Sequence, residues 1–315
     1  MFPTVIYKYG KGQDMKIGPC VMTLGFFDGV HIAHRDLIRK AREIADSKGI
    51  ALGVFTFSSE GGLKPEAKRL YTTEEKIKIF EGLGVDFAVV ADFASISSLS
   101  AEEFVKSALV RQMGCRAAVI GFNFRFGRGA EGDAQALCRL MAECGGECEV
   151  RRELTLDGQT VSTTLIRSCL EKGDVERATK LLGAPYRISS SAIHGRGVGK
   201  ALGFPTVNTR LEPWRVDLRR GVYRTAVRAD GVIYSALTNI GTCPTFEQRE
   251  NHAETYILDF DGDLYGKTVD IYLLEYMREE RRFESEKELI MQINVDKEQA
   301  IKKNGEIKWQ ELGLK

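Results

Sequence analysis

The sequence predicts two domains of different class: an α/β domain with a parallel sheet, then a compact antiparallel β-barrel or sandwich with a closing helix. The chain has 315 residues, which is enough for two domains. In the first half, short apolar runs alternate with helix-like segments. After about residue 185, β-rich runs are separated by Gly, Asp and Pro. We therefore expect domains at residues 1–184 and 185–315.

Four apolar runs of the first half are typical of strands buried on both faces. They are CVMTL, IALGVFTF, VDFAVVADF and CRAAVIGF, beginning at residues 20, 50, 85 and 115. Alternation of strands and helices at this spacing implies right-handed crossovers and a parallel sheet. Ligands of such sheets bind at the carboxyl ends of the strands.

Three helix-like segments separate these runs, at residues 34–49, 72–84 and 100–114. The second and third begin with capping boxes, Thr72 with Glu75 and Ser100 with Glu103. All three end at a glycine, the residue that most often follows a helix. The segment 163–183 predicts a pair of short helices that bridge the two domains.

The second half predicts short strands within residues 186–195, 221–241, 253–262 and 267–277. A helical pattern over residues 285–303 follows them. Turn residues at this spacing indicate antiparallel connections.

Composition narrows the class of protein. The net charge is +1 and apolar residues make up 43%, so nothing predicts a nucleic-acid or membrane partner. Apolar runs stay shorter than the roughly 18 residues of a membrane span, and MFPTVIYKYG does not resemble a secretory signal. The seven cysteines are scattered and predict reduced thiols in a cytoplasmic protein. Three of them, Cys138, Cys144 and Cys148, lack the remaining ligands of a zinc pattern.

The stretch GFFDGVHIAH, residues 25–34, lies between a predicted strand and a predicted helix. Glycines and a helix N-terminus suit a phosphate group, and two histidines on one helical face can donate to phosphate oxygens. From these residues alone, His31 and His34 could also pack in the core or bind a metal.

The stretch HGRGVGKALGFPTVN, residues 194–208, is rich in glycine but fits neither common nucleotide motif. The phosphate-loop motif needs a glycine where His194 stands, and the dinucleotide motif needs one where Lys200 stands. On its own, the stretch indicates a basic, flexible loop.

Together these segments resemble the prokaryotic bifunctional riboflavin kinase/FAD synthetase (FMN adenylyltransferase) family. GFFDGVHIAH is similar to the H-x-G-H signature of nucleotidyltransferases, and IGFNFRFGRGAEGD and VSTTLIRSCLEKGD to two further motifs. HGRGVGKALGFPTVN resembles the opening of the riboflavin kinase half. The resemblance covers nearly the whole chain. It implies a Rossmann-like nucleotidyltransferase domain, then an all-β riboflavin kinase barrel with a terminal helix.

The resemblance implies that the first domain transfers AMP from ATP to FMN and releases pyrophosphate. The histidines His31 and His34 would contact the ATP phosphates as catalytic residues. The other residues that would bind ATP or its phosphates are Gly25, Asp28, Gly29, Asn123, Ser162, Thr163, Thr164 and Arg167.

Two departures from the family pattern concern this first domain. Ala33 replaces the glycine of H-x-G-H, and TFSSEGGLKP replaces the family's T-F-x-P-x-P. They leave an alternative, a riboflavin kinase whose adenylyltransferase domain is weak, inactive or regulatory.

For the second domain the resemblance implies phosphorylation of riboflavin to FMN by ATP. Glu254 would be the catalytic base, Thr206 and Asn208 would bind Mg²⁺, and Arg278 would bind the flavin. The residues that would contact ATP are Gly195, Gly197, Lys200, Asn239, Gly241, Pro244 and Thr245. The expected ligands are small molecules: ATP, Mg²⁺, riboflavin, FMN and FAD.

Overall fold

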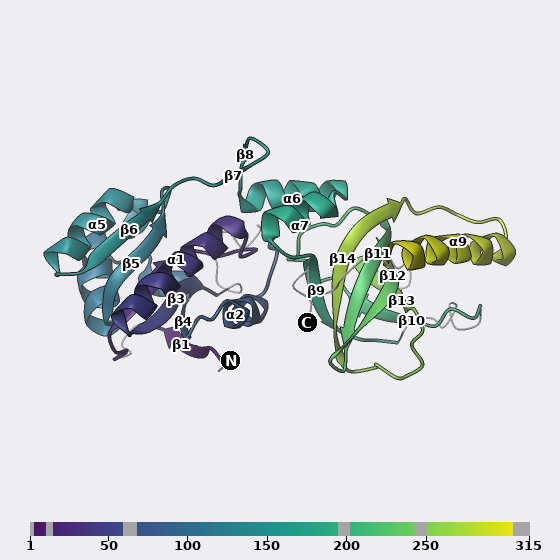
Figure 1. Cartoon of the computed structure of the whole chain (residues 1–315), viewed down its shortest axis with the longest axis horizontal. Coiled ribbons are helices and arrows are strands. Elements are labelled where there is room, and N and C mark those ends of the chain that lie inside the picture. The colour runs from purple at the N-terminus through teal and green to yellow at the C-terminus, as the bar shows by residue number, and fades with distance from the viewer. Residues whose placement is uncertain (1–2, 11–14, 59–67, 195–201, 243–250, 305–315) are drawn as a thin grey trace. The chain divides into compact units, whose positions relative to one another are not determined.

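The computed structural model describes residues 3–10, 15–58, 68–194, 202–242 and 251–304 (Figure 1). The chain divides into two compact units, Met1–Thr163 and Thr164–Lys315. Each unit has its own sheet, and the two sheets differ in class as the sequence predicts.

The first unit is built on a six-stranded sheet whose neighbouring strands are all parallel. The strand order is β1-β4-β3-β2-β5-β6. In chain order the strands are β1 (Val5–Tyr9), β2 (Cys20–Leu24), β3 (Ala51–Phe57), β4 (Phe87–Ala91), β5 (Cys115–Gly121) and β6 (Glu147–Arg151). The predicted parallel α/β domain is confirmed.

Helices cover both faces of this sheet (Figure 1). Helices α1 (Ile32–Lys48) and α2 (Thr73–Gly82) bury Leu37, Ile38, Ile77 and Phe80 in one core. The π-helix η1 (Phe104–Gln112) and α5 (Ala134–Glu143) belong to the core on the other face. The sheet is therefore buried on both faces, which explains the continuous apolar runs of its strands.

Short elements complete the first unit. They are α3 (Phe93–Ile96), α4 (Ala101–Glu103), the 3₁₀-helix η2 (Arg128–Ala130) and the hairpin strands β7 (Thr155–Leu156) and β8 (Gln159–Thr160). Both predicted capping boxes are present, at the starts of α2 and α4. The third predicted helix continues from α4 as η1, whose last turn is closed by Met113 N–H donating to Ala108 O, 3.0 Å away. The sequence signals of this segment, a capping box and a closing glycine, mark the ends of a helix and do not distinguish a π-turn from an α-turn.

Cys138 of α5 and Cys148 of β6 form a disulfide, with their Cα atoms 5.0 Å apart. The expectation of reduced thiols is therefore wrong for this pair. A helix followed by the adjacent edge strand brings the two residues to a separation that suits a disulfide. Cys20, Cys115, Cys144 and Cys169 remain free thiols.

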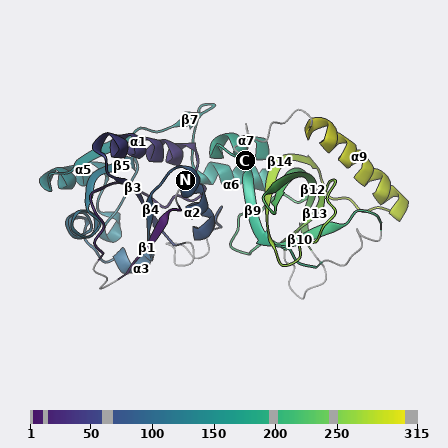
Figure 2. The ribbon, with the colours of Figure 1, turned by 60° about the horizontal axis from the view of Figure 1, so that its bottom comes forward.

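The second unit is a six-stranded antiparallel sheet of order β10-β13-β12-β11-β14-β9. Its strands are β9 (Tyr186–Ser191), β10 (Thr206–Arg210), β11 (Gly221–Ala229), β12 (Val232–Thr242), β13 (Asn251–Ile257) and β14 (Thr268–Arg278). Ile193, which follows β9, pairs with Asn208 of β10 and closes the sheet into a barrel (Figure 2). The barrel prediction is confirmed and the sandwich alternative is not.

The described residues of the second unit include the helices α6 (Thr163–Lys172), α7 (Val175–Leu182) and α9 (Glu286–Asn304). The last is the predicted terminal helix. Helix α7 packs on β9 and β14 through its apolar face, Val175, Ala178, Leu181 and Leu182. This packing places α7 in the second unit, although the sequence assigned residues up to 184 to the first domain.

None of the helices in the described part of the chain is both long and apolar enough to cross a membrane.

Candidate active sites

The strand order of the first unit reverses between β2 and β5. The chain leaves β2 toward β3 on one side, whereas β5 and β6 lie on the other side. Ligands of open parallel sheets bind outside such a reversal, at the carboxyl ends of the strands. Gly25 directly follows β2, and the exposed Asn123 lies two residues beyond β5. The structure thus brings these two predicted residues to one edge of the sheet.

The loop between β2 and α1 has an unusual backbone. Gly29 has φ of 86°, a conformation that favours glycine, and Phe27 and Val30 also have positive φ, 53° and 42°. Phe27 is fully buried and so holds the loop against the core. A Cβ added at Gly25 would lie only 3.2 Å from the ring of Phe27. We call residues 25–31 the phosphate loop, after the ligand that the sequence resemblance predicts for it.

His31 is the N-cap residue of α1, and its Nδ1 accepts a hydrogen bond from His34 N at 3.4 Å. The two imidazole rings stack with centroids 3.6 Å apart. Since Nδ1 of His31 is an acceptor, the neutral ring carries its proton on Nε2. Nδ1 of His34 is buried and has no hydrogen-bond partner among the described residues.

Burial keeps both imidazoles uncharged near neutral pH. Desolvation lowers the pKa of His31, which is 5% exposed, to about 4. The pKa of His34 lies well below its usual value, mainly because of desolvation and further because of His31 and Lys76. Neutral imidazoles can donate to phosphate oxygens without a change in their own charge.

These pKa shifts predict that the first unit loses stability in mild acid. In the unfolded chain a histidine is protonated below about pH 6.5, whereas the folded His31 stays neutral down to about pH 4. Between these values the unfolded state binds more protons, so the free energy of unfolding falls as the pH falls, by up to about 1.4 kcal/mol per pH unit for one histidine.

Urea unfolding followed by far-UV circular dichroism between pH 7.5 and 5 measures this slope. His31→Asn keeps a capping side chain but removes the titrating group, so its slope should be smaller. Equal slopes in the two proteins would mean that His31 does not contribute to the pH dependence of stability.

The Asp28 side chain connects the phosphate loop to the backbone of residues 70 and 71. It is 3% exposed, and its Oδ1 accepts hydrogen bonds from Leu70 N at 2.9 Å and Tyr71 N at 3.4 Å. Its carbonyl oxygen accepts a hydrogen bond from Thr163 Oγ1 at 3.0 Å. The structure therefore brings Asp28 and Thr163 together, and the Asp28 carboxylate supports the backbone of the loop.

Thr164 and Arg167 lie in the first turns of α6, and Ser162 directly precedes that helix. Ala33 lies in the first turn of α1, where an alanine is a good helix former. Most of the loop that replaces T-F-x-P-x-P, residues 59–67, lies outside the described residues.

The second site lies on one face of the barrel. Glu254 of β13 pairs with Asn208 of β10 on one side and with Asn239 of β12 on the other. Directly paired residues project from the same face of a sheet. Thr206 Oγ1 donates a hydrogen bond to Glu254 Oε1 at 3.0 Å. The structure thus brings together Thr206, Asn208, Asn239 and Glu254.

Glu280 was not found from the sequence. It lies in a charged run, where a solvated side chain is the ordinary expectation. In the structure Glu280 Oε1 accepts a hydrogen bond from Asn239 Nδ2 at 3.1 Å. The same oxygen occupies the space that a Cβ at residue 241 would need. Glu280 can therefore hold this position only while residue 241 is a glycine.

Arg278 ends β14 and is fixed by the terminal helix. Its Nη2 lies 2.7 Å and its Nε 3.0 Å from Asp296 Oδ2, and the Asp296 side chain is 4% exposed. Gln292 Nε2 donates to the other oxygen of Asp296 at 2.7 Å. The interactions of Asp296 determine where the guanidinium of Arg278 lies.

Breaking this ion pair is expected to destabilise the second unit. Asp296→Asn removes the charge that faces the partly exposed Arg278 and should lower the free energy of unfolding by about 2 kcal/mol, as for the loss of a hydrogen bond between charged groups. Both tryptophans of the chain, Trp214 and Trp309, come after the boundary of the first unit, so tryptophan fluorescence during urea unfolding reports on the second.

The matched control is Glu279→Gln, which removes the charge of an exposed partner of Arg219. An exposed pair contributes at most about 1 kcal/mol. Equal losses in the two variants would contradict a special role for Asp296.

Five residues predicted to contact ATP in the second unit lie outside the described residues: Gly195, Gly197, Lys200, Pro244 and Thr245. Their roles remain predictions.

The sequence left open a metal ion bound by His31 and His34. Within the described ranges, no cluster of three or more His, Cys, Asp or Glu residues could hold a metal ion. The oxygen groups of Thr206 and Asn208 belong to a different class of ligand, the hard oxygens that Mg²⁺ prefers.

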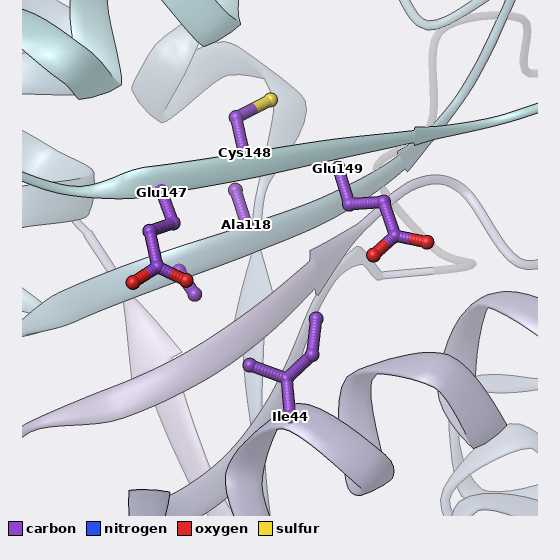
Figure 3. Close-up of a pocket in the computed structure, with 6 residues that line it drawn as sticks. Ile44, Ala118, Glu147, Cys148 and Glu149 are labelled. Atoms are coloured by element: carbon purple, nitrogen blue, oxygen red, sulfur yellow. The ribbon is translucent and has the colours of Figure 1, made fainter. Parts of the chain in front are cut away.

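A separate pocket of about 350 Å³ lies between α1 and the strands β5 and β6, and none of the predicted site residues lines it (Figure 3). Figure 3 shows Glu147 and Glu149 on the side of β6 that faces Ile44 of α1, whereas Cys148 points to the other side. Both carboxylates already pair with lysines of α1, Glu147 with Lys48 and Glu149 with Lys40. We assign no function to this pocket.

The first unit has a glycine-rich loop at the reversal of a parallel sheet, and the second has a hydroxyl, two amides and a carboxylate on one face of a barrel. These two arrangements are typical of transferases that use a nucleotide and have one site in each domain. The model of the FAD synthetase family matches residues 13–165, and that of the riboflavin kinase family matches residues 182–303. The chain belongs to the bifunctional riboflavin kinase/FMN adenylyltransferase family, as the sequence resemblance predicts.

Curated relatives match along most of their length. The bifunctional riboflavin kinase/FMN adenylyltransferase of Bacillus subtilis is 36% identical over 90% of this chain and 92% of that protein. The protein of the same name from Haemophilus influenzae is 34% identical over 89% of this chain and 93% of that protein.

A solved structure is similar in fold along nearly the whole chain. It is the crystal structure of a macrolide-efflux protein from Streptococcus pneumoniae, with a TM-score of 0.84, 29% identity, and coverage of 93% of this chain and 98% of that one. The name macrolide-efflux protein belongs to that relative. The similarity shows that the two chains have the same fold.

Proposed function

We propose that this enzyme phosphorylates riboflavin to FMN in its second unit and transfers AMP from ATP to FMN in its first unit, forming FAD. The observation that carries the proposal is that each unit has its own polar site: stacked, uncharged histidines at the sheet reversal, and Glu254 bonded to Thr206 on the barrel. The kinase-only alternative is not favoured, since the FAD synthetase match spans the phosphate loop and both departures from the family pattern.

In adenylyl transfer, a phosphate oxygen of FMN attacks the α-phosphorus of ATP, and the bond to the leaving pyrophosphate breaks. No protein nucleophile is needed, so the residues position the phosphates and stabilise their charge. The Nε2–H of His31 and the ring of His34 donate to the ATP phosphates. The backbone of the phosphate loop, Asn123, Ser162 and Thr163 form the rest of the cradle.

In the kinase reaction, Glu254 takes the proton of the ribityl 5′-hydroxyl as that oxygen attacks the γ-phosphorus of ATP. Thr206 donates to the Glu254 carboxylate and fixes its orientation. Arg278, oriented by Asp296, contacts the flavin.

Thr206 and Asn208 would hold Mg²⁺ together with phosphate oxygens of ATP. Both side chains offer hard oxygens from one face of β10, next to a carboxylate, and this donor set fits the ion. The metal would neutralise phosphate charge. We also propose a cytoplasmic location, where ATP is available to both sites.

A chromatographic time course with riboflavin, ATP and Mg²⁺, repeated from FMN, tests the proposal. FMN is expected first and FAD afterwards. FMN that accumulates without FAD from either start would leave only the kinase.

A further inference from the structure

Lys76 of α2 has no role in the reactions described above, although it is buried beside the phosphate loop. The residue is 1% exposed. Its Nζ donates hydrogen bonds to Phe57 O at 2.9 Å, Phe26 O at 3.2 Å and Thr56 Oγ1 at 3.2 Å. A desolvated ammonium group is costly unless such acceptors surround it, so its position is well determined.

The three acceptors connect two neighbouring strands. Phe57 is the last residue of β3, and Phe26 lies in the phosphate loop directly after β2. Thr56 Oγ1 also donates to Phe26 O, at 2.9 Å. Two donors therefore fix the carbonyl of Phe26, five residues before His31.

The charge of Lys76 also acts on the site. Its Nζ lies 5.1 Å from the centroid of the Phe26 ring, a cation–π distance. Burial lowers the pKa of Lys76 to about 8, although Asp28 opposes that shift. Lys76 in turn helps to lower the pKa of His34. A protonated Lys76 thus adds to the desolvation that already lowers the pKa of this imidazole.

We propose that Lys76 is a positioning residue for adenylyl transfer, which fixes the phosphate loop against the end of β3. The inference rests on the proposed function of the first unit. Lys76 touches no reacting atom in this assignment and acts through the backbone of Phe26 and the ring of His34.

The test compares Lys76→Met with Lys78→Met. Both variants replace a lysine of α2 by an unbranched apolar residue, but Lys78 is exposed. For each variant the KM for ATP and the kcat are measured with FMN as substrate. Riboflavin phosphorylation by the second unit of the same molecule reports the amount of active protein.

In Lys76→Met, three oxygens lose a buried donor and the loop is expected to shift. The KM for ATP in FAD formation should rise about tenfold or more, with a fall in kcat. A smaller folded fraction lowers the apparent kcat but cannot raise KM, so this increase separates positioning from a loss of folded protein. Lys78→Met and the riboflavin kinase activity should stay unchanged.

An unchanged KM for ATP in Lys76→Met, whatever the fall in kcat, would overturn the inference. Failure of the unsubstituted protein to make FAD from FMN would instead contradict the proposed function.

Discussion

Glu254→Gln is expected to lower the rate of riboflavin phosphorylation by about 10²–10⁴-fold, the usual contribution of a general base. The amide keeps the size of the side chain and can still accept the hydrogen bond of Thr206, but it cannot take the proton of the 5′-hydroxyl. The measurement is the kcat for FMN formation at saturating riboflavin and ATP.

Two controls accompany this experiment. FAD formation from added FMN should be unchanged, because it takes place in the other unit. Glu275→Gln removes a carboxylate of β14 that pairs with Arg224 and should leave kcat close to the original value. Full riboflavin phosphorylation in Glu254→Gln would show that another group is the base.

His31→Ala is expected to lower FAD formation by about 10²–10³-fold, as for loss of one donor to a developing charge. FMN formation should be spared. The measurement is kcat/KM for ATP with FMN as the second substrate, followed chromatographically.

Alanine also removes the N-cap of α1, which costs about 1 kcal/mol of stability. His31→Asn separates the two effects, because asparagine is a good N-cap residue but lacks the imidazole. It should retain the stability of the first unit and still lose most FAD formation. Equal loss of both products in either variant would indicate a folding defect and contradict the assigned role.

Local signals in the sequence were sufficient for much of the fold. Capping boxes such as Thr72 with Glu75 are satisfied within one turn, so they are visible in four consecutive residues. The same is true of the continuous apolar runs that form β2 to β5, and of the glycine that ends α1, Gly49 with φ of 64°.

The features that the sequence did not reveal depend on distant partners. Lys76 looks like any lysine of an amphipathic helix until β2 and β3 bring three oxygens to it. The resemblance named Arg278, but not its partner Asp296, which lies 18 residues further along the chain. The resemblance named Glu254, but only the register of β10 and β13 brings Thr206 to it.

The packing of α7 on the barrel determines where the chain can be divided into two fragments. A fragment that stops at residue 184 would carry the four apolar side chains of α7 without the strands that cover them. Such a surface invites aggregation and recognition by chaperones and proteases. A fragment that starts at Thr164 keeps the helix with its strands, so the choice of cloning boundary decides which half inherits an intact surface.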